Sequence, residues 1–397
     1  MNDLAFDPAA LVDDPYPTYD RLRREAPLAW HDATGMWLVA RHADVDRLLR
    51  DRRLGRVFTP YEPRARYDPW NLLNIHSLLE LEPPAHTRLR RLVAHPFTPR
   101  RIAGLRGRIA VLADGLLDAA DPADLDLMAD YAERLPVDVI AELLGVPDEL
   151  RAPLRPWSNR IVALYELDHD DATAQAAIDA STAFTAMLDE LIAWRRRAPG
   201  DDLFSALIHA DLDGDALTRD ELVATAALLL NAGHEASVNV IGNGVVALLA
   251  HRDQLARVRA AGGLPGAVDE LIRYDSPLSL FQRTVFEPVE IAGRRLMPGA
   301  RVGLLLASAN RDPDVFAGPD TLDLDRSPNP HVGFGAGIHY CLGAPLARLE
   351  IAVAFARLLA RAGDLAVVSP PERRRSFQFR GYQRVRLRLT GRDGGSG

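Results

Sequence analysis

The stretch FGAGIHYCLG, residues 334–343, contains the single cysteine of this 397-residue chain. Cys341 lies two residues after His339, with Gly335, Gly337 and Gly343 close by. Glycines let the backbone turn tightly and approach a flat ligand closely. The residues that follow, LGAPLARLEIAVAFARLLARAG, have the apolar spacing of an amphipathic helix.

The chemistry of this cysteine depends on where the helix begins. Pro345 fits a first-turn position, because its missing N–H costs no hydrogen bond there. Cys341 would then precede a helix N-terminus, whose N–H groups and dipole stabilise a thiolate, the form of cysteine that binds metals. Two other interpretations stay open on the residues alone: a buried, inert thiol, and a nucleophile paired with His339 that has no apparent orienting group.

The composition excludes several classes of protein. One cysteine cannot form an intramolecular disulfide, and no histidine pair stands at a zinc-site spacing to it. The net charge of −8 is the wrong sign for nucleic-acid binding. The N-terminus has neither the basic start nor the apolar core of a signal peptide, and no apolar run is long enough to span a membrane. We therefore expect a cytoplasmic protein, with a flexible tail at 389–397.

The stretch FGAGIHYCLGAPLARLE resembles the haem-binding loop of the cytochrome P-450 family, and it matches every fixed position of that loop. The resemblance implies a haem b (iron protoporphyrin IX) with the Cys341 thiolate as the proximal iron ligand, which favours O–O cleavage. It also implies that Phe334, Gly335 and Gly343 line the cofactor. The expected fold is mainly helical with small sheets, a single domain over residues 1–397 shaped as a triangular helical prism.

Other stretches resemble the family's contacts to the haem propionates. His86 and Arg90 in EPPAHTRLRRLVAH are four residues apart, so a helix would present both on one face. Arg283, expected on a strand, and His339 match two further propionate ligands of the family. Without the resemblance, the pair at 86 and 90 would also fit a solvated basic helix face.

The segment DELIRYDSP contains Glu270 and Arg273, three residues apart. Such a pair is usually a weak surface salt bridge. The resemblance instead implies a buried structural lock that is completed by Arg326.

Residues 219–250 predict a helix about 48 Å long that begins with a capping box at Thr218 and Glu221. Because it is apolar almost all round, it must lie inside the protein. Glu235 in its middle therefore needs a reason, since a buried charge is costly unless it is paired. One interpretation is a polar core contact with Asn239, one turn further on.

The resemblance implies that this helix crosses the distal face of the haem. Small residues at Ala232, Gly233 and Ala236 would leave room for dioxygen. Most members have threonine where this chain has Ala236, and Ser237 points about 100° further around the helix. Our hypothesis is a proton relay through water, with Glu235 as the proton source and either Ser237 or a substrate hydroxyl completing it.

Three stretches resemble the family's substrate-recognition segments, at 58–81, 278–281 and 377–379, although each of them also fits ordinary core. Their large apolar side chains predict a mostly apolar ligand. The candidate substrate contacts, including one from the central helix, are Tyr61, Trp70, Asn231, Leu278, Leu280, Phe281 and Gln378.

The leading prediction is a monomeric haem-thiolate monooxygenase that hydroxylates or epoxidises a small molecule in bacterial secondary metabolism. The chain has no flavin or iron–sulfur motif, so electrons would come from a ferredoxin and its reductase, with Arg88 and Arg91 in a basic docking patch. Two alternatives stay open: oxidative coupling or ring closure without oxygen insertion, which the missing threonine favours, and a non-catalytic haem sensor or carrier.

Overall fold

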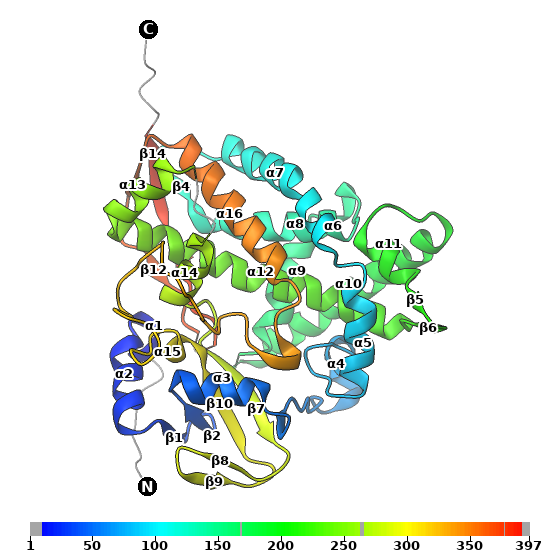
Figure 1. The fold of residues 1–397 in the computed structure, drawn as a ribbon. Helices are drawn as coiled ribbons and strands as arrows, with labels where there is room; N and C mark the ends of the chain where they lie inside the picture. The colour runs from blue at the N-terminus through cyan, green and yellow to red at the C-terminus, as the bar shows by residue number, and fades with distance from the viewer. Residues whose placement is uncertain (1–9, 167–168, 263–265, 377, 391–397) are drawn as a thin grey trace. The chain divides into compact units, whose positions relative to one another are not determined.

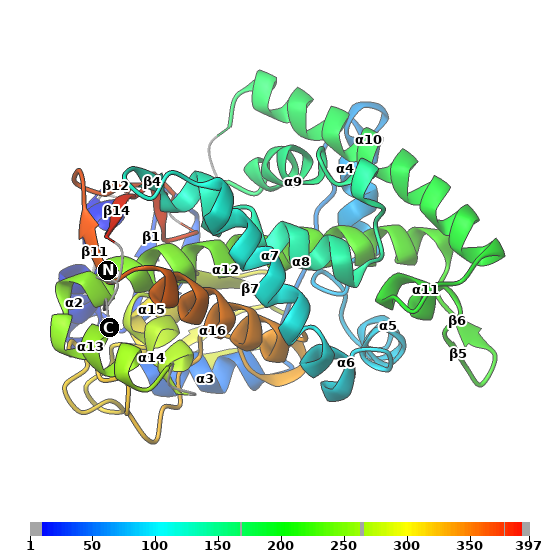
Figure 2. The same cartoon turned by 90° about the horizontal axis from the view of Figure 1, so that it is seen from above.

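The computed structural model describes residues 10–166, 169–262, 266–376 and 378–390. These residues form two compact units. The first contains Met1–Gly55, Arg106–Leu135 and Ala236–Gly397, and the second contains Arg56–Leu105 and Pro136–Glu235. Helices predominate over short strands in Figures 1 and 2, which confirms the predicted fold class.

The first unit contains a five-stranded sheet in the order β1-β2-β10-β7-β3. Its strands are β1 (Leu28–His31), β2 (Met36–Val39), β10 (Arg301–Leu305), β7 (Leu280–Val285) and β3 (Leu54–Gly55). Only the β10–β2 pair is parallel; the other neighbours in this sheet are antiparallel. Val302, Leu304 and Leu305 on β10 are fully buried, so this strand lies in the core and holds β7 in register.

Smaller sheets complete the strands of this unit: β11 (Asp364–Val367) with β14 (Arg386–Thr390) and β4 (Leu125–Asp126), β12 (Glu372–Arg373) with β13 (Tyr382–Arg384), and β8 (Val289–Ile291) with β9 (Arg294–Leu296). Leu389 and Thr390 pair with β11. These two residues therefore belong to a strand and not to the tail expected at 389–397; the rest of that tail, 391–397, lies outside the described residues.

The helices of the first unit are α1 (Ala10–Asp13), α2 (Tyr16–Glu25), α3 (His42–Arg50), α7 (Arg106–Ala119), a π-helix (Leu127–Ala132), α13 (Arg252–Ala260), α14 (Ala267–Tyr274), α15 (Leu306–Ala309), a 3₁₀ turn η3 (Gly337–His339) and α16 (Ala344–Arg361). α16 runs beside α7 (Figure 2). Nε of Arg357 on α16 donates a hydrogen bond to Asp114 on α7 at 2.9 Å, which ties the two helices together.

The second unit contains α4 (Arg64–Ile75), α5 (Ala85–Ala94), α6 (Pro99–Gly104), α8 (Leu135–Leu143, whose first residue belongs to the first unit), a 3₁₀ turn (Asp148–Leu150), α9 (Leu154–Ala163), α10 (Asp171–Arg197), α11 (Leu203–Ile208) and the hairpin β5 (Asp211–Leu212) with β6 (Asp215–Ala216). α10 packs along α9 and α4.

The long helix α12 (Arg219–Ala250) has the bounds that its sequence predicts. Its capping box is formed: the N–H of Glu221 donates to Oγ1 of Thr218 at 3.2 Å, and the Glu221 carboxylate accepts from the N–H of Thr218 at 2.9 Å. None of the helices in the described part of the chain is long and apolar enough to cross a membrane.

Candidate functional site: the cysteine loop and the central helix

The loop that carries Cys341 is shaped by two glycines. Gly335 and Gly337 both have φ near +69°, a conformation that strains any other residue. A Cβ on Gly337 would lie 2.6 Å from the backbone oxygen of Leu49, so the loop passes against the end of α3. The N–H of Cys341 donates to the oxygen of Phe334 at 3.0 Å, which closes the loop.

Cys341 is a half-buried thiol three residues before α16 begins. Gly343 caps this helix and Pro345 lies in its first turn, as the sequence predicts. A Cβ on Gly343 would lie 3.9 Å from the cysteine sulfur, so the capping residue is close to the thiol. The helix N-terminus therefore lies where it can stabilise a thiolate.

The chemistry of the donor set indicates which metal group this thiol suits. Among the described residues, no group of three or more histidine, cysteine, aspartate or glutamate side chains could hold a metal ion. A metal bound to Cys341 must therefore bring its other ligands with it, as the iron of a porphyrin does. The residues present fit a haem and do not fit a zinc site.

The predicted propionate partners lie on regular elements of the two units. In the first unit, Arg283 is buried on β7 with 4% of its surface exposed, and His339 is half-buried in η3. In the second unit, His86 is buried on α5 with 2% exposed, and Arg90 is half-buried one turn later. Guanidinium and imidazole groups can donate hydrogen bonds to a carboxylate, so these residue types suit a carboxylate-bearing ligand.

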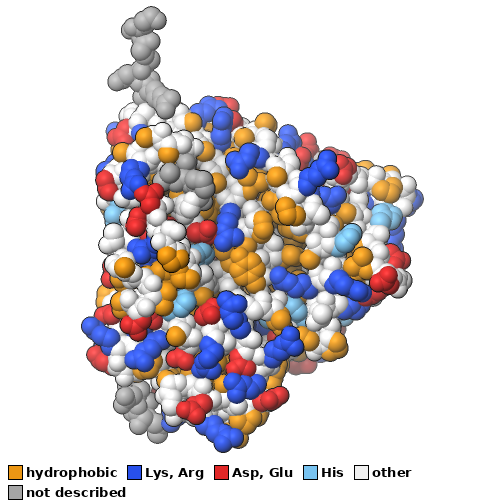
Figure 3. Space-filling view, viewed as in Figure 1, with side chains coloured by type: hydrophobic (Ala, Val, Ile, Leu, Met, Phe, Trp, Pro, Cys, Tyr) orange, Lys and Arg blue, Asp and Glu red, His pale blue; other side chains and the backbone are white. Residues whose placement is uncertain are grey.

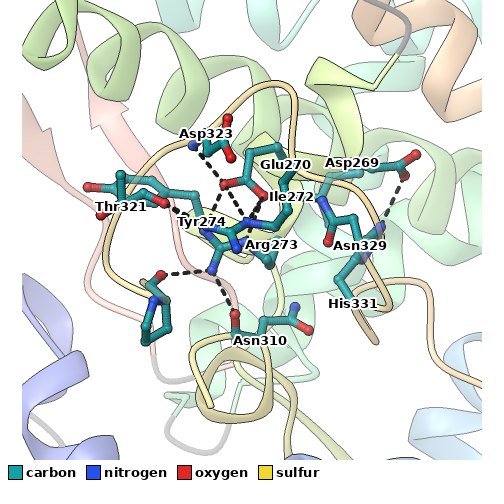
Figure 4. A network of polar contacts seen from close by, with 12 residues as sticks. Asp269, Glu270, Ile272, Arg273, Tyr274, Asn310, Thr321, Asp323, Asn329 and His331 are labelled. Carbon is teal, nitrogen blue, oxygen red and sulfur yellow. Dashed lines mark hydrogen bonds and ion pairs between the residues drawn. The ribbon is translucent and has the colours of Figure 1, made fainter. Parts of the chain in front are cut away.

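The glutamate–arginine lock is confirmed (Figure 4). Arg273 donates to both oxygens of Glu270, at 2.7 and 2.8 Å, and Nε of Arg326 lies 3.1 Å from the same carboxylate. Arg273 also donates to the backbone oxygens of Asn310, at 2.9 Å, and Thr321, at 3.0 Å. Both side chains of the pair are almost fully buried, so the lock fixes the segment that leads into the cysteine loop.

One face of α12 is less buried than the rest of its middle. Ala232 is exposed and Gly233 and Ala236 are half-buried, whereas Glu235 and Ser237 are buried. Gly233 also allows close packing, because a Cβ there would lie 2.9 Å from Cδ1 of Ile140 on α8. The small residues thus form an open stripe in the middle of the helix, where the other residues from 230 to 245 are buried.

The structure bears on two interpretations of the polar residues of α12: a contact between Glu235 and Asn239, and Ser237 as part of a proton relay. Nδ2 of Asn239 is buried and has no hydrogen-bond partner among the described residues, so it does not donate to Glu235. The alternative in which Glu235 serves only as a partner of this amide loses its support. Ser237 is 3% exposed, and as the next residue of the helix it lies about 100° around the axis from Ala236.

The predicted substrate contacts of the second unit are Tyr61, Trp70 and Asn231, which differ in burial and in hydrogen bonding. Trp70 is 1% exposed, and its indole N–H donates to the backbone of Ile161 at 3.1 Å. Its ring packs on Tyr61 and Tyr165, at 5.1 and 5.2 Å between centroids, so Trp70 is a core residue. Tyr61 is half-buried and remains a candidate. The amide oxygen of Asn231 accepts a hydrogen bond from Ser158 Oγ at 2.9 Å.

In the first unit, the tertiary structure joins two of the predicted substrate segments. Leu278 forms a β-bridge with Phe379, and the N–H of Ser279 donates to the oxygen of Gln378 at 2.9 Å. The remaining candidates from this unit are Phe281, which is half-buried, and Leu280, which is 5% exposed and packs in the core. The burial of Trp70 and Leu280 was not visible in the sequence, because an apolar residue in a pocket wall and one in the core look alike.

The basic docking patch needs a correction. Nε of Arg88 donates to Asp215 at 2.8 Å, and its other nitrogens bond Glu221 and the oxygen of Ala216. Arg91 lies 3.6 Å from Asp215. Arg88 therefore does not supply free positive charge, because acids of its own unit compensate it. Figure 3 likewise shows blue and red side chains interspersed on the face drawn.

Comparison with known proteins agrees with the site. The sequence profile described as Cytochrome P450 matches residues 264–362. Cytochrome P450 107B1 of Saccharopolyspora erythraea is 41% identical over 97% of each chain. Cytochrome P450 monooxygenase PikC of Streptomyces venezuelae is 43% identical over 90% of this chain and 86% of its own. A solved structure of the bacillaene polyketide synthase cytochrome P450 PksS of Bacillus subtilis 168 has a TM-score of 0.89 and 34% identity, over 97% of this chain and 100% of that one.

The chain belongs to the cytochrome P450 family, and it is a cytochrome P450 monooxygenase. One of its bacterial relatives is named as a polyketide biosynthesis cytochrome P450. Members of this family carry haem, act on small molecules and receive electrons from redox partners. The comparisons therefore agree with the conclusion that the cysteine loop and its lock suggest.

Proposed function

We propose that this chain hydroxylates or epoxidises a mostly apolar small molecule in bacterial secondary metabolism, as a monomer served by a ferredoxin and its reductase. The observation that carries the proposal is the half-buried Cys341 thiol at the N-terminus of α16. The overall reaction consumes one dioxygen, two electrons and two protons. One oxygen atom enters the substrate and the other leaves as water.

The cofactor we propose is haem b, with the Cys341 sulfur as its iron ligand. When bound, the haem supplies the binding and activation of dioxygen. The residues that would hold its two carboxylates are His86, Arg90, Arg283 and His339. Arginine suits this role because its planar guanidinium donates two parallel hydrogen bonds to a carboxylate.

Proton delivery in our proposal relies on Glu235, which sits one residue before the alanine that replaces the usual threonine. Ala236 has no side-chain proton to donate, and the buried Ser237 lies about 100° around the helix from it. A hydroxyl of the substrate, or a water that it orders, therefore completes the path beside Ala232 and Gly233. The substrate should consequently carry a hydroxyl near the carbon that is oxidised.

The alternative reaction is oxidative coupling or ring closure without oxygen insertion. It is favoured by the same observation, since Ala236 removes the hydroxyl that normally assists delivery of protons to dioxygen. Labelled dioxygen distinguishes the two reactions, because only oxygen insertion places the label in the product.

Two experiments test the proposal. The reduced protein exposed to carbon monoxide should show the spectrum of thiolate-bound haem, and Cys341→His should change it to that of imidazole coordination. A spectrum of imidazole type in the wild-type protein would refute the assignment. Compounds that shift the haem spin state then identify the substrate class, and a redox-competent protein that turns over none of them would favour a sensor or carrier.

A further inference from the structure

The helix α14 carries two adjacent acids that bind different partners (Figure 4). Glu270 holds the arginines of the lock, whereas Asp269 faces the cysteine loop. The carboxylate of Asp269 accepts a hydrogen bond from Nε2 of His331 at 3.0 Å and one from Nε of Arg348 at 2.8 Å. One carboxylate thus joins three segments that are far apart in the sequence: α14, the loop before Cys341, and α16.

Both partners of Asp269 contact the ring of Phe334. The His331 ring packs against it with 5.8 Å between centroids, and the guanidinium carbon of Arg348 lies 4.4 Å from its centroid. The second contact has the geometry of a cation–π interaction. Phe334 in turn accepts the backbone hydrogen bond of Cys341 at 3.0 Å. A continuous series of contacts therefore connects Asp269 to the cysteine.

The hydrogen bonds fix the orientation of the His331 ring. Nδ1 of His331 accepts a hydrogen bond from the N–H of Gly333 at 3.1 Å, and Nε2 is bonded to Asp269. Rotation of the ring would break both bonds. Burial alone would raise the pKa of Asp269, but the hydrogen bond from His331 and the charge and hydrogen bond of Arg348 lower it below its ordinary value. Asp269 is therefore ionised at neutral pH.

We propose that Asp269 is a positioning residue: by anchoring His331 and Arg348 it clamps Phe334, and so controls how firmly Cys341 holds the haem and how much charge the thiolate donates. The inference rests on the proposed haem-thiolate site. Groups that orient a metal ligand from one contact away change metal affinity by roughly 10- to 100-fold when they are removed.

Asp269→Asn tests this because it keeps the size of the side chain while removing its charge. Both donors bind Oδ1, so the variant replaces a charged acceptor with a neutral amide oxygen and weakens the bond from the Arg348 guanidinium, which is no longer an ion pair. Phe334 then loses part of its restraint, and the sulfur gains access to solvent and hydrogen bonds. We expect a higher haem reduction potential, because hydrogen bonds to a ligand sulfur withdraw charge from the iron. We also expect haem to transfer to apomyoglobin about tenfold faster.

Asp114→Asn provides a matched control. Asp114 also pairs with α16, since Nε of Arg357 donates to it at 2.9 Å, but Arg357 is about two and a half turns from Arg348 along the helix. Both variants remove a carboxylate that pairs with α16: Asp269 pairs with Arg348, and Asp114 pairs with Arg357 and Arg361. Haem potential and haem transfer are measured on the resting holoenzyme, so neither depends on turnover. The control should behave as the wild-type protein does in both.

A double-mutant cycle with Phe334→Leu shows whether Asp269 acts through the ring. The effect of Asp269→Asn on the potential should disappear in the Phe334→Leu background. The inference is wrong if Asp269→Asn changes only the free energy of unfolding, if it matches Asp114→Asn, or if its effect persists in full without Phe334. Should Asp269→Asn fail to fold, Arg348→Lys replaces it, because lysine keeps the charge but loses the planar contact. A wild-type protein that takes up no haem would refute the proposed function and this inference with it.

Discussion

Replacing Gly337 with alanine should disrupt the cysteine loop. Gly337 has φ +69°, which costs an alanine about 1–2 kcal/mol. The new Cβ would lie 2.6 Å from the backbone oxygen of Leu49, well inside the 3.4 Å at which ordinary contact begins. Because that neighbour is backbone at the end of α3, it cannot rotate away, and such overpacking costs about 1–3 kcal/mol more. We therefore expect a loss of about 2–5 kcal/mol in the free energy of unfolding, the sum of these two ranges.

The assay is urea unfolding followed by circular dichroism, together with the carbon monoxide spectrum of the reduced protein. Gly115→Ala is the control, since Gly115 is exposed within α7 and a Cβ there would meet nothing within 4 Å. That change should stabilise the protein by about 0.5–1 kcal/mol, because alanine favours the helix. If Gly337→Ala unfolds within about 0.5 kcal/mol of the wild-type protein and keeps its spectrum, the close approach of the loop to α3 is wrong.

Three further predictions concern acidic residues. Glu270→Gln should lower the free energy of unfolding, measured in urea, by about 3–5 kcal/mol, because it leaves buried arginines without their carboxylate. The control Asp46→Asn, in an exposed ion pair, should cost no more than about 0.5 kcal/mol. Equal effects of the two variants would contradict a buried lock. Glu235→Gln should lower product formed per reductant consumed about 100-fold with haem content unchanged, and unchanged coupling would remove Glu235 from proton delivery. Burial raises the pKa of Glu350 from 4.5 to about 8. Between these two pH values the folded protein keeps the group protonated whereas the unfolded chain ionises it. The contribution of Glu350 to stability therefore falls as the pH rises through this range. Glu350→Gln should therefore gain stability relative to wild type across that range; a constant difference from pH 5 to 8 in urea unfolding would show that Glu350 does not titrate there.

The sequence predicted the local features of the site because neighbouring residues determine them. The two glycines with positive φ, the start of α16 after Gly343 and the capping box at Thr218 all depend on hydrogen bonds or sterics within a few residues. The bounds of α12 and the lock at Glu270 were also predicted, the first from a continuous apolar pattern and the second from the resemblance to the family.

What the tertiary structure alone decided is which distant side chains meet. The segment with Trp70 fitted both a pocket wall and the core, and Trp70 is a core residue. Arg88 was expected in a basic docking patch and is instead paired with acids more than 120 positions away. Asp269 stands next to a recognised motif, yet its contacts with His331 and Arg348 depend on the packing of α14, α16 and the cysteine loop. The backbone conformation of a residue is determined largely by its immediate neighbours in the sequence. Its side-chain partners depend on how whole helices and strands pack, and that packing exists only in the folded chain.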